Sequence, residues 1–171
     1  MVLGLSLQTF TLIHVVISLV GIVAGLVVLF GFLGNRRLDG WTALFLITTA
    51  LTSVTGFLFP FKGITPGINV GIISVIVLAI AAVARYPLQL RWKKTYVIAA
   101  CIALYFNVFV LVVQSFEKIA TLRALAPTQK EPPFAIAQIC VLAAFVALTT
   151  LAVRRFQVVP VPGVKSATTT V

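Results

Sequence analysis

Residues 67–86 read GINVGIISVIVLAIAAVARY and decide the fold class, because Arg85 is the only charged side chain among them. Apolar residues lie on every side of this segment, whereas a strand of a membrane β-barrel alternates apolar and polar residues over about ten positions. A helix rises about 1.5 Å per residue, so about 20 residues cross the roughly 30 Å hydrocarbon core of a bilayer. The segment is therefore predicted to be a transmembrane helix.

Four further windows have a similar length and composition, and none of them contains a charged residue. They are 10–33, 41–61, 95–116 and 134–153. Hydrophobic residues make up 61% of the 171-residue chain and charged residues only 9%, against roughly 25% charged residues in soluble domains. This composition excludes a soluble globular protein.

The fold class is predicted to be all-α, a compact bundle of five transmembrane helices. These helices form a single domain over residues 1–157, and a mobile tail follows at 158–171. No Lys or Arg precedes the first window, which is therefore expected to be retained as a helix and not cleaved as a signal peptide.

The basic residues are divided unequally between the two sides of this bundle. The gaps after the first and third windows, the tail and Arg85 hold nine of the 13 Lys and Arg residues. Since the more basic side of a membrane protein faces the cytoplasm, the N-terminus is predicted outside and the C-terminus cytoplasmic. The composition resembles that of small hydrophobic proteins of bacterial inner membranes, so a multi-pass inner-membrane protein is expected.

The net charge of +10 does not indicate nucleic-acid binding, because the cations are dispersed over short gaps and no basic domain exists. We interpret them as topology signals and as contacts with the headgroups of anionic membrane lipids. Arg85, at the end of its window, is expected to extend its side chain to the headgroups.

Small and hydroxyl residues form stripes along three windows and indicate where helices pack, because lipid gives helices no hydrophobic drive to associate. We expect contacts within the bundle, and the alternatives are an interface in a homo-oligomer or with a partner membrane subunit, or the lining of a pore. The stripes contain Ser18, Gly21 and Gly25; Gly67, Gly71 and Ser74; and Thr42, Thr48, Thr49, Thr52, Ser53, Thr55 and Gly56.

One face of the fourth predicted helix carries Asn107 and Gln114 and continues to Glu117, directly after the window. Asn107 lies about 15 Å from Glu117 along a helix, near the middle of the bilayer, where an amide facing lipid would cost several kcal/mol. It is therefore predicted to point into the bundle. His14 and Gln138 belong to the same outer half. These five residues are the predicted ligand-binding residues of an outward-opening polar pocket; alternatively, each makes a separate interhelical hydrogen bond.

The chain offers few groups for a metal or cofactor, and none is predicted. His14 is the only histidine, so one chain cannot supply two axial histidines to a haem. Asp39 is expected on the side opposite Glu117, which removes a carboxylate cluster. Cys101 and Cys140 are predicted to be unpaired core residues, too far apart along the bundle axis for a disulfide.

The longest gap, 117–133, is predicted to lie outside. Ile119, Leu122 and Leu125 recur at three-residue spacing with charges between them, so this part continues the fourth helix or lies along the headgroups. The proline-rich stretch 126–133 is predicted to be non-helical.

No catalytic residue is assigned, because the dinucleotide, P-loop and HExxH motifs are all missing from the sequence. The expected function is a non-catalytic membrane protein that binds or passes a small molecule through the polar pocket. One alternative is a membrane anchor or accessory subunit of a larger complex. Another is a membrane enzyme that acts at the outer interface with His14 or Glu117.

Overall fold

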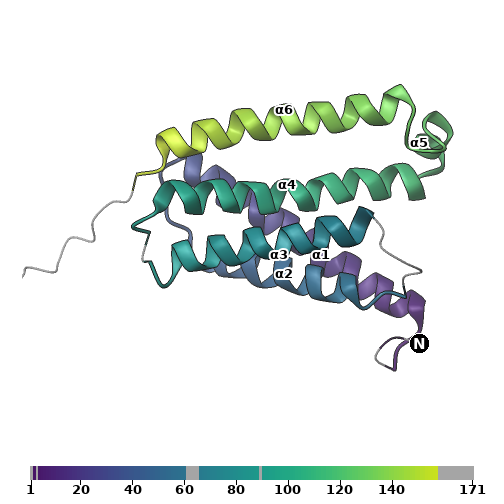
Figure 1. Ribbon diagram of the computed structural model, residues 1–171, viewed down its shortest axis with the longest axis horizontal. Helices are drawn as coiled ribbons and strands as arrows, with labels where there is room; N and C mark the ends of the chain where they lie inside the picture. Colours follow the sequence, from purple (N-terminus) through teal and green to yellow (C-terminus); the bar gives the residue numbers. More distant parts are fainter. Residues whose placement is uncertain (1, 3, 61–65, 89, 158–171) are drawn as a thin grey trace, which may run out of the picture.

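The structure, a computed structural model, describes residues 2, 4–60, 66–88 and 90–157, and six helices without any strand follow one another in these residues. They are α1 (Leu7–Leu33), α2 (Asp39–Phe57), α3 (Pro66–Arg85), α4 (Lys93–Lys118), α5 (Ala120–Leu125) and α6 (Pro132–Arg155) (Figure 1). All but α5 are long and apolar enough to cross a membrane. The predicted all-α fold with five such helices is confirmed, and it is the architecture of a multi-pass membrane protein. The tail at 158–171 lies outside the described residues.

The two ends of α1 are set by residues suited to helix termini. The Ser6 hydroxyl accepts a hydrogen bond from the Thr9 backbone N–H at 3.1 Å, so it satisfies a donor that the helix leaves unpaired. Beyond Gly34, Asn35 has a φ of 51°, a left-handed conformation that asparagine adopts more readily than most residues. The chain therefore turns here and leads into α2.

The long gap forms a short helix of its own. α4 ends at Lys118, where Ile119 takes an extended backbone conformation, and α5 follows. Residues 126–131 are non-helical, as predicted, but the prediction is wrong for Pro132 and Pro133, which belong to α6. α6 begins at Pro132, because proline in the first turn of a helix lacks only an N–H that would have no intrahelical acceptor.

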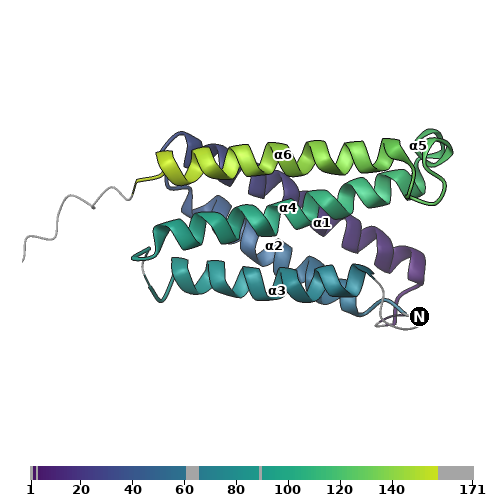
Figure 2. The ribbon, with the colours of Figure 1, turned by 45° about the horizontal axis from the view of Figure 1, so that its top comes forward.

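Helices α1 to α4 form a four-helix bundle in which sequence neighbours pack together and α4 also packs against α1 (Figures 1 and 2). α6 lies outside this ring, against α4 and α1. It is the least buried of the five long helices, with 11% of its most apolar window buried. α4 is therefore the central helix, with neighbours on three sides.

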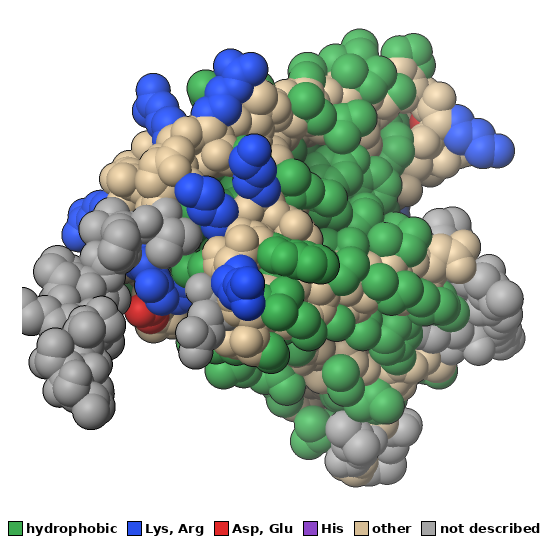
Figure 3. Space-filling model, turned by 60° about the vertical axis from the view of Figure 1, so that its left-hand side comes forward, with side chains coloured by type: hydrophobic (Ala, Val, Ile, Leu, Met, Phe, Trp, Pro, Cys, Tyr) green, Lys and Arg blue, Asp and Glu red, His purple; other side chains and the backbone are tan. Residues whose placement is uncertain are grey.

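Basic residues gather at one end of the bundle (Figure 3). We call it the cationic end; here α1, α3 and α6 end and α2 and α4 begin. The opposite end, where α1 begins, is called the N-terminal end. The cationic end carries Arg36, Arg37, Arg91, Lys93, Lys94, Arg154 and Arg155.

The most densely packed core lies between the bundle centre and the cationic end. A Cβ atom added to Gly25 would come within 2.5 Å of Leu104 and 2.9 Å of Phe45, so the α1 backbone packs closely against α4 and α2. The Phe32 ring packs edge-on against those of Tyr96 and Phe156, with centroid distances of 5.4 and 5.0 Å. At Gly25 the predicted small-residue packing is thus a contact within the bundle.

The expectation for Arg85 is wrong. Its side chain is 5% exposed and forms an ion pair with Asp39, at the start of α2. The guanidinium carbon also lies 5.4 Å from the centroid of the Tyr96 ring. Because Asp39 supplies the countercharge at the same level of the bundle, the guanidinium need not extend to the lipid headgroups.

Candidate ligand-binding site

The face of α4 that carries the predicted polar stripe is closed at one end of the bundle and open at the other. Near the cationic end, Tyr96 and Ala103 are 1% and 0% exposed. Toward the N-terminal end, Val110 on the same face is 36% exposed, and Gln114 and Glu117 are exposed. We call these last three residues the uncovered face of α4.

The course of α1 explains this change. α1 crosses the bundle obliquely, so that its N-terminal half lies away from α4 and α6 (Figures 1 and 2). The buried residues of α1 accordingly begin at Gly21, apart from Phe10 near the start of the helix. Over its last turns, this face of α4 is therefore not covered by α1.

Asn107 lies at the boundary between the closed and open parts of α4. Its Nδ2 donates a hydrogen bond to Thr49 Oγ1 at 3.1 Å, and Thr49 is fully buried. The amide thus points into the bundle, as predicted, and connects α4 to α2 across the bundle. Asn107 is therefore the innermost polar residue next to the uncovered face of α4.

His14 is held by α2 and not by another predicted site residue. Its Nδ1 lies 2.7 Å from Thr55 Oγ1, and that hydroxyl donates to the Leu51 carbonyl at 2.7 Å. Because the single hydroxyl proton is used there, we assign the Nδ1 proton to His14, which leaves Nε2 as an acceptor. The imidazole also packs edge-on against Phe59 with a centroid distance of 5.2 Å.

Gln138 connects α6 to α4. Its Nε2 donates to the Phe109 carbonyl at 3.3 Å, whereas its Oε1 is buried and finds no hydrogen-bond partner among the described residues. The Thr52 hydroxyl of α2 is also buried and has no hydrogen-bond partner in that part of the chain. An unpaired buried polar atom costs about 1–3 kcal/mol, so both atoms favour a bound hydrogen-bonding group.

Gln114 and Glu117 lie at the outer limit of the stripe. Glu117 Oε1 pairs with Lys118 Nζ at 3.4 Å, and both side chains are more than half exposed. Among the residues described, none of the five predicted site residues hydrogen-bonds to another of the five. His14 and Glu117, the pair that an enzyme at this interface would use, bind Thr55 and Lys118 instead.

Sequence reasoning did not identify the partners of His14 and Asn107, which are the α2 threonines Thr55 and Thr49. The sequence predicts two adjacent packing stripes here, one with Thr49 and one with Thr52 and Thr55, but residue spacing does not show which helix each stripe faces. Within the described chain, no three His, Cys, Asp or Glu side chains are grouped as a metal site requires.

Comparisons with known proteins give no relative, since no family model, curated protein or solved structure matches this chain.

Proposed function

We propose that this protein is a non-catalytic membrane protein that binds or passes a small polar molecule at the N-terminal end of its bundle, beside the uncovered face of α4. The observation that carries this proposal is the change along one face of α4, from a fully buried Ala103 to an exposed Gln114. The exposed part of this polar stripe provides one wall of a ligand site. Asn107, where the face becomes buried, limits how deep the site extends.

The polar groups around Asn107 lie at one level of the bundle. Thr52 is one turn beyond Thr49, the partner of Asn107, or about 4.5 Å along α2. Gln138 bonds to Phe109, which is two residues beyond Asn107, or about 3 Å along α4. An amide, a hydroxyl and a carbonyl oxygen from three helices thus lie within about one helical turn of one another along the bundle axis, a level at which a ligand could use them.

The charge distribution supports an external ligand. If the cationic end faces the cytoplasm, as basic residues do in bacterial inner membranes, then the uncovered face of α4 opens to the outside. Membrane lipids would surround the rest of the bundle and contact its cationic rim.

Cysteine accessibility tests the proposal directly. The test uses a background with Cys101→Ala and Cys140→Ala. In it, Val110→Cys and Gln114→Cys should each react with a membrane-impermeant methanethiosulfonate reagent that carries a sulfonate group, added to proteoliposomes. A cysteine at Ala103 should not react, because that position is fully buried. If Val110 and Gln114 cysteines react only with an apolar, membrane-soluble reagent, lipid covers this face and the proposal fails.

A thermal-shift screen against amino acids, sugars and nucleosides tests binding. Any stabilisation by one of these compounds should be lost in Asn107→Leu and kept in the matched variant Asn69→Leu, because Asn69 is an exposed asparagine of α3. Equal loss in both variants would remove Asn107 from the site.

A second candidate function, an accessory subunit of a larger membrane complex, is favoured by α6. This helix is only 11% buried over its most apolar window. Its exposed face carries Cys140, Ala143, Ala144 and Ala147, small residues that allow another helix to approach closely. Ala144→Phe should then release a partner that co-purifies with the wild type in mild detergent.

A further inference from the structure

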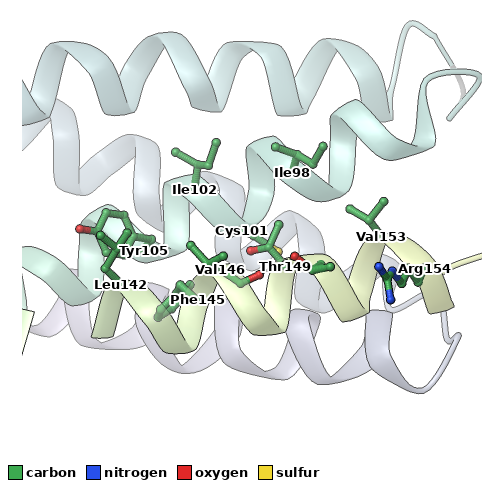
Figure 4. A pocket seen from close by; sticks show the side chains of 11 residues that line it. Ile98, Cys101, Ile102, Tyr105, Leu142, Phe145, Val146, Thr149, Val153 and Arg154 are labelled. Atoms are coloured by element: carbon green, nitrogen blue, oxygen red, sulfur yellow. Dashed lines mark hydrogen bonds between the residues drawn. The ribbon is translucent and has the colours of Figure 1, made fainter. Parts of the chain in front are cut away.

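A groove runs between α4 and α6 in the half of the bundle next to the cationic end (Figure 4). Its volume is about 450 Å³, within the roughly 300–1,000 Å³ typical of small-molecule sites. Ile98 and Tyr105 of α4 and Leu142 and Val146 of α6 are among the side chains that line it, and nearly all of its surface is hydrocarbon. It lies apart from the uncovered face of α4, so its argument does not depend on the proposed function.

The length of the groove matches one leaflet of a bilayer. Its lining on α6 extends from Leu142 to Arg154, twelve residues or about 18 Å along the helix. Half of a roughly 30 Å hydrocarbon core is about 15 Å, the depth that one acyl chain occupies. A chain that begins at the cationic end would therefore reach the far end of the groove near the bilayer centre.

The cationic end of the groove carries a free positive charge. Arg154 lines the groove there and is exposed. Over the described residues, the ion pairs involve Arg37, Arg85 and Lys118, so the Arg154 guanidinium has no carboxylate partner. A smaller hollow of about 280 Å³, between α3 and the start of α4, has no charged residue among those that line it.

We propose that the groove between α4 and α6 binds one acyl chain of an anionic phospholipid, with the phosphate on Arg154. The groove contributes apolar contact along the chain, and the guanidinium contributes a charge-assisted bond to the phosphate. Charge at the mouth and hydrocarbon along the length together select an amphiphile that is negative at one end. A free phosphate has no acyl chain for the groove, and in phosphatidylcholine the quaternary ammonium of the headgroup offsets the negative charge of the phosphate.

Native mass spectrometry of the full chain in detergent, with added phosphatidylglycerol or phosphatidylcholine, tests the proposal. The wild type should retain phosphatidylglycerol about fivefold better, the effect expected of one arginine near an anionic headgroup. Arg154→Gln should remove this preference, whereas the matched variant Arg155→Gln should keep it, because Arg155 is not among the lining residues. Val146→Trp, which fills the groove from a position 60% exposed, should lower retention of both lipids.

Three results would overturn the proposal. They are equal retention of the two lipids by the wild type, equal loss of preference in Arg154→Gln and Arg155→Gln, and unchanged retention in Val146→Trp. The second would show a general attraction of the basic rim for anions, and the third would place the chain elsewhere. Circular dichroism and gel filtration check that each variant folds, and Thr149→Phe replaces Val146→Trp if the latter does not.

Discussion

The ion pair between Asp39 and Arg85 should respond very differently to the loss of each partner. The Arg85 side chain is 5% exposed, whereas that of Asp39 is 67% exposed. Asp39→Ala leaves a guanidinium out of solvent without its carboxylate, which costs about 2–3 kcal/mol. Arg85→Met leaves Asp39 free to bind water and replaces the charge with an apolar chain of similar length, so we expect a cost of about 1 kcal/mol, mainly the contact with the Tyr96 ring.

The buried Cys101 reports on this stability. It lies beside the groove between α4 and α6 but is only 2% exposed, so a charged, water-soluble reagent alkylates it only when the bundle opens. In a Cys140→Ala background, the midpoint of Cys101 labelling during a dodecyl sulfate titration should fall in the order wild type, Arg85→Met, Asp39→Ala. The double variant should resemble Arg85→Met, because without Arg85 the carboxylate has no buried charge to neutralise.

The opposite order would refute the reasoning. If Arg85→Met were at least as destabilising as Asp39→Ala, the pair would not be governed by the burial of the guanidinium. Arg37→Ala is the matched control, because its Nε lies 3.7 Å from the same carboxylate but its side chain is 39% exposed. We expect that variant to change the midpoint little, as exposed ion pairs contribute about 0–1 kcal/mol.

Two further predictions concern packing and pH. Gly25→Ala should destabilise the bundle by about 1–3 kcal/mol in the same titration, since the added Cβ would collide with Leu104. The control Gly40→Ala, with open space around it, should be neutral or slightly stabilising. Equal effects of the two substitutions would contradict the close packing of α1 against α4 at Gly25. Desolvation raises the pKa of Glu131, but hydrogen bonds to its carboxylate from its own backbone N–H, from the side chain and backbone of Thr128 and from the Lys130 backbone together outweigh it and lower the pKa below its usual value. The carboxylate should therefore keep the Thr128 amide protected from hydrogen exchange at neutral pH and release it as pH falls through that lowered pKa; a Glu131→Gln variant with the same pH profile would exclude this cause.

The number and approximate positions of the long helices could be predicted, because uncharged windows of this length have one stable form in lipid. The ends were less predictable: α4 extends to Lys118, beyond the expected window, since charged residues can remain helical where they reach water. The Arg85 error has a clear physical origin. Its partner, Asp39, is 46 residues away in sequence, and hydropathy carries no information about which loops meet.

The direction of Asn107 followed from the cost of an amide in lipid, but its partner did not. That partner depends on how α2 is rotated and on the oblique course of α1, which packing between helices determines. Cys140 shows the same limit: it was expected in the core, and it is exposed because α6 lies at the edge of the bundle. Whether the five polar residues serve one ligand stays a prediction that the accessibility experiment tests.

Unequal packing along the bundle axis has a mechanical consequence. The rings of Phe32, Tyr96 and Phe156 and the close contact at Gly25 hold α1 and α4 together in the half of the bundle next to the cationic end. Separating α1 from α4 at the N-terminal end breaks few apolar contacts between them, whereas separating them next to the cationic end disrupts the core. Pairs of spin labels on these two helices should therefore show broad distance distributions at the N-terminal end and narrow ones near Gly25.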